Sequence, residues 1–218
     1  MIRPIREVRA RSEGNVALGL LGSLIDGAPK GGTLLLSGCE GAGKSTLLLQ
    51  ACASVASTNE KVLYLTGEES EEDVRARLDR LGLPPDRIFV DAGDGGTLNL
   101  AKALQDARTI GFRLIIVDSL QTVHIPGEPI GPLGEKAIVS ALRKYCKSTG
   151  TIAILIGQLN TDDSPSGTRA VSHGVDATLD LSLDGEIRVL RCKKCRWHAA
   201  PVQMRMTMLP HGLEVLDD

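Results

Sequence analysis

Residues 38–45 are Gly38-Cys39-Glu40-Gly41-Ala42-Gly43-Lys44-Ser45, which satisfy every fixed position of the phosphate-binding pattern GxxxxGK[ST]. An apolar, strand-like run precedes them at 33–37, and a helix-like run begins at 44, which is the setting that makes the pattern specific. The glycines let successive backbone N–H groups turn inward around phosphate oxygens. A chance glycine-rich turn is the competing interpretation, and the strand–loop–helix context argues against it.

This loop predicts an ATP site that works with Mg²⁺. Lys44 should reach the β- and γ-phosphates, and the Ser45 hydroxyl should ligate the metal ion. The helix that begins near Lys44 adds the positive end of its dipole. The predicted nucleotide-binding residues are Gly38, Cys39, Glu40, Gly41, Ala42, Gly43, Lys44, Ser45 and Thr46.

A second buried run, 112–118, ends in Asp118 and delivers a carboxylate to the same sheet edge, where it can hold Mg²⁺ through water. Strands that end in aspartate are common, so the loop upstream is what favours this interpretation. Glu68 and Glu69 follow the run 61–66 and could supply the catalytic carboxylate, or serve only as acids in a first helical turn. Gln158 follows the run 151–157 and could sense the γ-phosphate, or be an ordinary polar residue at a strand end.

Apolar runs rich in Val, Ile and Leu alternate with helical stretches, which predicts an α/β fold with a mainly parallel central sheet flanked by helices. After Gly174 the runs are shorter and joined by Asp184-Gly185, so we expect antiparallel strands at the C-terminal end. Residues 1–30 are expected to form a lead segment and residues 31–218 a single core. The loops 121–135 and 159–172 follow strand ends, where open α/β sheets bind ligands.

The composition suits a cytoplasmic globular protein, with 42% hydrophobic residues and no run long enough for a signal peptide or membrane span. Of the five cysteines, Cys192 and Cys195 could be half of a zinc site, but no second pair accompanies them. The net charge of −2 excludes coating of DNA by bulk attraction. A local basic segment, 187–207, carries six cations and no acid, as either a DNA contact or a guarded edge strand. These cations are Arg188, Arg191, Lys193, Lys194, Arg196 and Arg205.

Several motifs together resemble the ATPase core of the bacterial RadA/Sms family. They are the phosphate loop with STLLLQ at 45–50, VLYLTGEES at 62–70, VDSLQT at 117–122, SHGVD at 172–176 and RCKKCRW at 191–197. The likeness covers residues 31–215, whereas the zinc module and protease-like domain of that family have no counterpart here. The segment QLN at 158–160 is similar instead to DnaB-type replicative helicases.

The resemblance implies a RecA-like ATPase that acts on DNA as a ring, most simply a hexamer. It implies Glu68 as catalytic carboxylate, with Glu69 second, and loops 121–135 and 159–172 around a central channel. The family's Lys-Asn-Arg-Phe-Gly signature is Lys-Cys-Arg-Trp-His here. In related hexamers a Lys-x-Arg pair enters the neighbouring subunit's site, which implies that role for Lys194 and Arg196.

The leading hypothesis is therefore a homo-oligomeric, DNA-dependent ATPase of recombination, repair or replication that binds single-stranded DNA and no membrane. Only Trp197 could stack on bases within the basic segment, so DNA binding should depend on phosphate contacts and on salt. One alternative is a nucleotide-gated regulatory ATPase similar to KaiC that does not act on DNA. Another is a small-molecule kinase, but the sequence has no arginine-rich lid insert.

Overall fold

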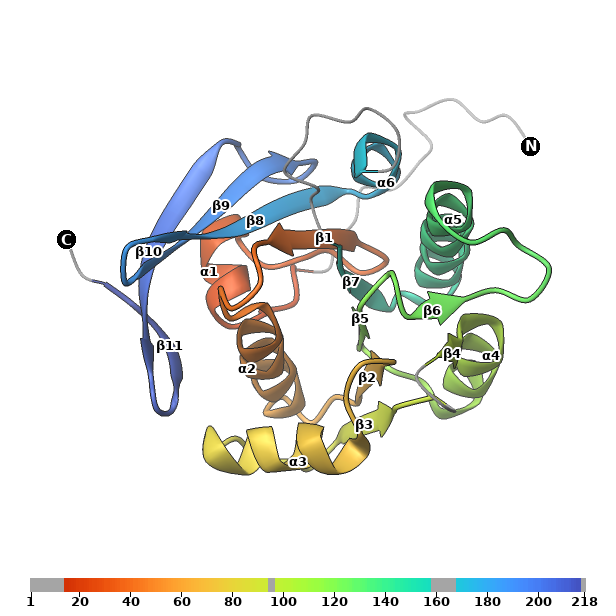
Figure 1. Cartoon of the computed structure of the whole chain (residues 1–218), viewed down its shortest axis with the longest axis horizontal. Helices are drawn as coiled ribbons and strands as arrows, with labels where there is room; N and C mark the ends of the chain where they lie inside the picture. The colour runs from red at the N-terminus through yellow and green to blue at the C-terminus, as the bar shows by residue number, and fades with distance from the viewer. Residues whose placement is uncertain (1–13, 94–96, 158–167, 217–218) are drawn as a thin grey trace.

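The computed structural model describes residues 14–93, 97–157 and 168–216, and it has the predicted α/β fold (Figure 1). Its main sheet has nine strands in the order β11-β10-β9-β8-β1-β7-β5-β2-β3, and β4 and β6 form a separate small sheet. The strands are β1 Thr33–Gly38, β2 Val62–Thr66, β3 Ile88–Asp91, β4 Leu98–Asn99, β5 Leu114–Asp118, β6 Val123–His124, β7 Ile152–Ile156, β8 Ala177–Asp184, β9 Ile187–Cys195, β10 Val202–Leu209 and β11 Gly212–Val215. The helices are α1 Leu20–Ile25, α2 Lys44–Ala56, α3 Glu71–Arg80, α4 Leu100–Ile110, α5 Pro132–Thr149 and α6 Thr168–Gly174.

The parallel and antiparallel parts of the sheet divide where the sequence predicted. Strands β8, β1, β7, β5, β2 and β3 are parallel to their neighbours, whereas β8 through β11 pair antiparallel. The hairpin between β8 and β9 turns at Asp184-Gly185, as that dipeptide predicted. Strand β9 is longer than the expected run 186–192, because a bulge at Thr178/Leu179 keeps it paired as far as Cys195.

Two apolar layers cover the sheet, and the strand alternation assigns residues to them. Leu34 and Leu36 face the core that contains α1, α2 and α3, whereas Leu35 between them faces the core that contains α4 and α5. Figure 1 shows these two groups of helices on opposite sides of the sheet. Both faces of the parallel strands are therefore buried, which explains their unbroken apolar runs.

The segment that precedes Gly31, expected as a lead, contributes to the core in its described part. Leu18, Leu21 and Ile25 are fully buried in the same apolar cluster as α2. The Trp197 indole donates hydrogen bonds to the carbonyls of Ile25 at 3.1 Å and Gly27 at 2.8 Å. The packed unit thus starts before residue 31, and Trp197 is a structural residue that holds this segment.

Two expected loops contain regular structure. The stretch 125–134 was expected to be irregular, but α5 begins inside it at Pro132, because proline is favoured in the first turn of a helix. The loop 159–172 overlaps α6, which starts at Thr168. Among the described helices, none is long and apolar enough to cross a membrane.

The C-terminal hairpin is joined to α2. The side chain of Gln50 accepts a hydrogen bond from the Leu213 amide and donates one to the Leu213 carbonyl, both at 3.0 Å. A Cβ on Gly212 would lie 2.8 Å from the Gln50 amide nitrogen, so this close approach requires glycine. Helix α2 and strand β11 are therefore held together directly behind the phosphate loop.

Candidate functional site

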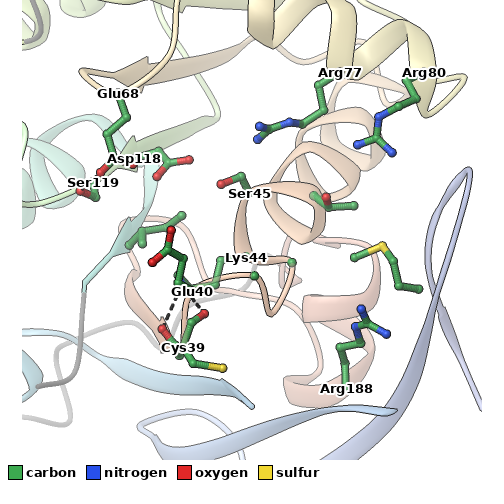
Figure 2. Close-up of a pocket in the computed structure, with 16 residues that line it drawn as sticks. Cys39, Glu40, Lys44, Ser45, Glu68, Arg77, Arg80, Asp118, Ser119 and Arg188 are labelled. Atoms are coloured by element: carbon green, nitrogen blue, oxygen red, sulfur yellow. Dashed lines mark hydrogen bonds between the residues drawn. The ribbon is translucent and has the colours of Figure 1, made fainter. Parts of the chain in front are cut away.

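A cavity of about 760 Å³ opens at the carboxyl end of β1, between the phosphate loop, α3 and the C-terminal strands (Figure 2). Eight of the nine predicted nucleotide-binding residues line it, and Ala42 instead is buried in the apolar core. The lining residues are Gly38, Cys39, Glu40, Gly41, Gly43, Lys44, Ser45, Thr46, Glu68, Arg77, Arg80, Asp118, Ser119, Ile156, Arg188 and Met208. The cavity is large enough for a nucleotide.

Close packing behind the loop explains two of its glycines. A Cβ on Gly38 would lie 2.0 Å from the Leu181 carbonyl oxygen, and one on Gly43 would lie 2.6 Å from the Met208 methyl group. Gly43 also has a φ of 102°, a conformation that L side chains rarely adopt. The Lys44 ammonium donates to the carbonyls of Gly38 at 2.9 Å and Cys39 at 2.8 Å. The loop therefore has the shape and the positive charge that phosphate oxygens require.

Asp118 and Ser45 meet at one side of this loop. Asp118 ends β5 with only 6% of its surface exposed, and its carboxylate accepts a 2.5 Å hydrogen bond from the Tyr64 hydroxyl. Burial raises the pKa of Asp118, and hydrogen bonds from Tyr64 and Ser45 oppose that shift. A buried carboxylate beside a hydroxyl suits Mg²⁺, which takes few protein ligands and completes its shell with phosphate and water oxygens. The described residues contain no group of three His, Cys, Asp or Glu that could hold a metal without such help.

The two glutamates after β2 have different surroundings. Glu68 lines the cavity, and its Oε1 accepts a 2.7 Å hydrogen bond from the Ser119 hydroxyl. Glu69 instead forms an ion pair with Arg77 on α3. Burial raises the pKa of Glu69, and Arg77 opposes the shift. Only Glu68 is thus presented to a molecule in the cavity.

A family model described as an AAA domain matches residues 21–164. The chain belongs to this family. It is similar to the DNA repair protein RadA of Pseudomonas aeruginosa, 34% identical over 183 residues that cover 82% of this chain and 38% of that protein. It is also similar to RadA of Halalkalibacterium halodurans, 30% identical over 222 residues that cover 97% of this chain and 47% of that protein. The chain therefore spans less than half the length of these relatives.

Two solved structures share the fold of this AAA domain. The KaiC-like protein PH0186 of Pyrococcus horikoshii superposes with a TM-score of 0.74 at 19% identity, covering 93% of this chain and 98% of that one. The second structure is the ATPase domain of another protein, and it gives a TM-score of 0.78 at 14% identity, covering 94% of each chain. Together with the family match, they identify a RecA-like P-loop ATPase core.

Five residues line the cavity of the AAA domain that the sequence patterns did not single out: Ser119, Arg77, Arg80, Arg188 and Met208. The signal for Ser119 was its position directly after Asp118. Arg77 and Arg80 lie three residues apart on α3, the spacing that puts two side chains on neighbouring positions of one helix face. Arg188 and Met208 come from β9 and β10, whose approach to the cavity depends on how the hairpin curves.

Lys194 and Arg196 do not line the cavity of their own chain. The Lys194 ammonium donates to the carbonyls of Ser172 at 2.9 Å and Val175 at 2.8 Å, which satisfies the end of α6, and its burial lowers the Lys194 pKa. Arg196 forms a 3.0 Å ion pair with Asp176. Both side chains thus contact the segment 172–176, whereas Gln158 lies outside the described residues.

The basic segment 187–207 is less free than its composition predicted. Five of its cations contact acceptors within the chain, because β8 and its flanks supply carboxylates and carbonyls beside β9. Arg188 donates to the Glu186 carbonyl, Arg191 to Ser182 and Gln203, Lys193 pairs with Asp180, Lys194 binds the α6 carbonyls and Arg196 pairs with Asp176. Much of this charge is therefore balanced locally.

Proposed function

We propose that this ATPase core is a DNA-dependent ATPase of recombination, repair or replication that works as a homo-oligomeric ring on single-stranded DNA. The observation that carries the ATPase part is the convergence of the phosphate loop, Asp118 and Glu68 on one cavity. The DNA part rests on the similarity to RadA, whose name describes a DNA repair protein. A hexamer and a cytoplasmic location are further parts of this proposal.

In the proposed reaction the backbone amides of the loop and Lys44 bind the triphosphate, and Glu68 takes a proton from the attacking water. Ser119 holds the Glu68 carboxylate through their 2.7 Å hydrogen bond. Ser45 and Asp118 would hold Mg²⁺, which supplies charge neutralisation at the phosphate oxygens when bound. Glu69 is paired with Arg77, which supports Glu68 as the catalytic carboxylate.

The proposed ring completes each site with a neighbour's cations. Lys194 and Arg196 would stabilise the γ-phosphate charge of the adjacent subunit's ATP, and Gln158 would report its loss to the following loop. In the single chain Arg196 pairs with Asp176, and its side chain remains 48% exposed. Exchange of that surface ion pair for a phosphate contact in the ring costs little, since such pairs are weak.

The regulatory alternative has one observation in its favour. The loop 121–135 was expected at a DNA channel, yet it contains Glu128 and Glu135 and no lysine or arginine. Acidic side chains repel a phosphate backbone, so this loop does not resemble a DNA contact. A KaiC-like ATPase that responds to nucleotide without DNA would be consistent with it.

Turnover of ATP with and without single-stranded DNA, over a series of salt concentrations, separates the two functions. Stimulation that falls as salt rises supports the DNA motor, because phosphate contacts weaken as counterions compete. Turnover that is indifferent to DNA at every salt concentration supports the regulatory ATPase. Light scattering with nucleotide and DNA measures assembly in the same samples.

Nucleotide binding can be followed with a natural probe. Cys39 is exposed in the phosphate loop, whereas Cys52, Cys146 and Cys192 are buried. ATP with Mg²⁺ should protect Cys39 from alkylation in the wild-type chain and not in Lys44→Ala. Equal labelling of Cys39 with and without ATP in the wild type would argue against binding at this loop.

A further inference from the structure

The cavity has two chemically different ends (Figure 2). Glu68, Asp118 and Ser119 are gathered at one end, where β2 and β5 finish. At the other end Arg77 and Arg80 extend from α3, and Arg188 and Met208 extend from β9 and β10 on the opposite side. Lys44 and Ser45 lie between the two ends.

This polarity fixes the direction of a bound nucleotide. Hydrolysis requires the terminal phosphate beside the catalytic carboxylate, so the γ-phosphate belongs at the Glu68 end. The phosphates then run along the loop past Ser45. The nucleoside must therefore lie at the other end, between α3 and the C-terminal strands.

Two arginines at that end have unused hydrogen-bonding capacity. Arg80 is exposed and makes no hydrogen bond or ion pair with the rest of the described chain. Arg188 donates through Nη1 to the Glu186 carbonyl at 2.6 Å, but its Nε is buried without a partner. Arg77 differs from both, because it is paired with Glu69.

The chemistry of this end suits a flat, polarisable group. A guanidinium is planar and stacks on aromatic rings, and a thioether packs well against them. No aromatic side chain is among the described residues that line the cavity, so guanidinium groups are left to provide the stacking surface.

We propose that Arg80 and Arg188, together with Met208, form the base-binding subsite of this ATPase, which deepens the proposed function and rests on it. Because Arg80 and Arg188 are donors only, neither can accept a hydrogen bond from the adenine amino group. Recognition is by stacking, so the larger purine rings bind better than pyrimidines, and ATP and GTP bind with similar affinity.

Calorimetry with ATP, GTP, UTP and inorganic tripolyphosphate tests this subsite in the wild type and in Arg80→Lys and Arg188→Lys. Lysine keeps the positive charge and removes the planar group. Each substitution should weaken ATP and GTP about three- to tenfold, the range expected for loss of a guanidinium–ring contact. Tripolyphosphate, which has no base, should keep its wild-type affinity within about twofold, because the charge is retained.

Arg75→Lys and Arg191→Lys are matched controls on α3 and β9. Arg75 pairs with Asp79, and Arg191 contacts Ser182 and Gln203, so neither lines the cavity. Both controls should bind all four ligands as the wild type does.

The subsite is overturned if both lysine variants bind ATP normally, or if ATP and tripolyphosphate weaken equally. It is also overturned if the wild type binds UTP as tightly as ATP. In each of these cases a phosphate site still exists, and the proposed ATPase function survives. If the wild type binds neither ATP nor tripolyphosphate, the proposed function fails as well.

Discussion

The hydroxyl of Ser119 offers a sharp test of the catalytic arrangement, through the substitution Ser119→Ala. This hydroxyl donates a 2.7 Å hydrogen bond to Glu68, and both residues line the cavity. If Glu68 is the general base, Ser119 is a positioning residue that orients its carboxylate toward the attacking water. Its removal should lower kcat and leave the affinity for ATP unchanged.

The size of the effect follows from the type of bond. A hydrogen bond to a charged group contributes about 1.5–3 kcal/mol. If all of it orients Glu68 in the transition state, turnover falls roughly ten- to hundredfold, since each 1.4 kcal/mol or so is a factor of about ten. Glu68→Gln, which removes the base itself, should cost about 10²–10⁴-fold.

Single-turnover hydrolysis and ATP binding by calorimetry measure the two quantities separately. Ser119→Ala in a Glu68→Gln background should cause no further loss, because the serine acts only through the glutamate. Ser140→Ala, at an exposed position on α5, is the matched control. A single Ser119→Ala variant with wild-type kcat, or a double variant whose losses multiply, would refute the coupling.

Four other outcomes are expected. Lys44→Ala should abolish ATP binding in calorimetry, because it removes the one ammonium group of the phosphate loop, and retained affinity would mean that the site is misassigned. Gly43→Ala should lower the free energy of unfolding by about 1–3 kcal/mol in urea titrations, since its φ of 102° and the Met208 contact both oppose a side chain; an unchanged midpoint would contradict this. Trp197→Phe should cost about 1–3 kcal/mol in the same assay because two carbonyls lose their donor, with no loss of DNA affinity; weaker DNA binding at full stability would instead indicate base stacking. Arg196→Ala should be inactive alone and partly rescued in mixed rings with Lys44→Ala subunits, and the absence of rescue would place Arg196 outside the neighbour's site.

Local patterns were sufficient to predict the phosphate site. The loop 38–45 combines glycine positions, a lysine and a hydroxyl with a strand and a helix on either side, so each feature constrains the same few residues. Asp118 was predicted in the same way, from an apolar run that ends in a carboxylate. The start of α3 was marked by Ser70 and Asp73, which form the capping box that the structure contains.

Contacts that depend on the packing of distant elements could not be predicted. The pairing of Glu69 with Arg77 depends on how α3 rotates over β2, and that rotation is set by burial of Val74 and Leu78. Arg188 reaches the cavity only because of the curvature of the C-terminal strands. The burial of Leu21 and Ile25 was missed since six residues of helix give too short a period to read.

The bond between Gln50 and Leu213 also limits how copies of this chain can associate. The amide and carbonyl of Leu213 face away from β10, at the outer margin of the sheet, where another polypeptide could otherwise add a strand. A side-chain amide already satisfies both groups, so main-chain zippering across Leu213 is blocked. Neighbouring copies must therefore recognise one another at this margin through side chains, which leaves them free to shift relative to one another during a catalytic cycle.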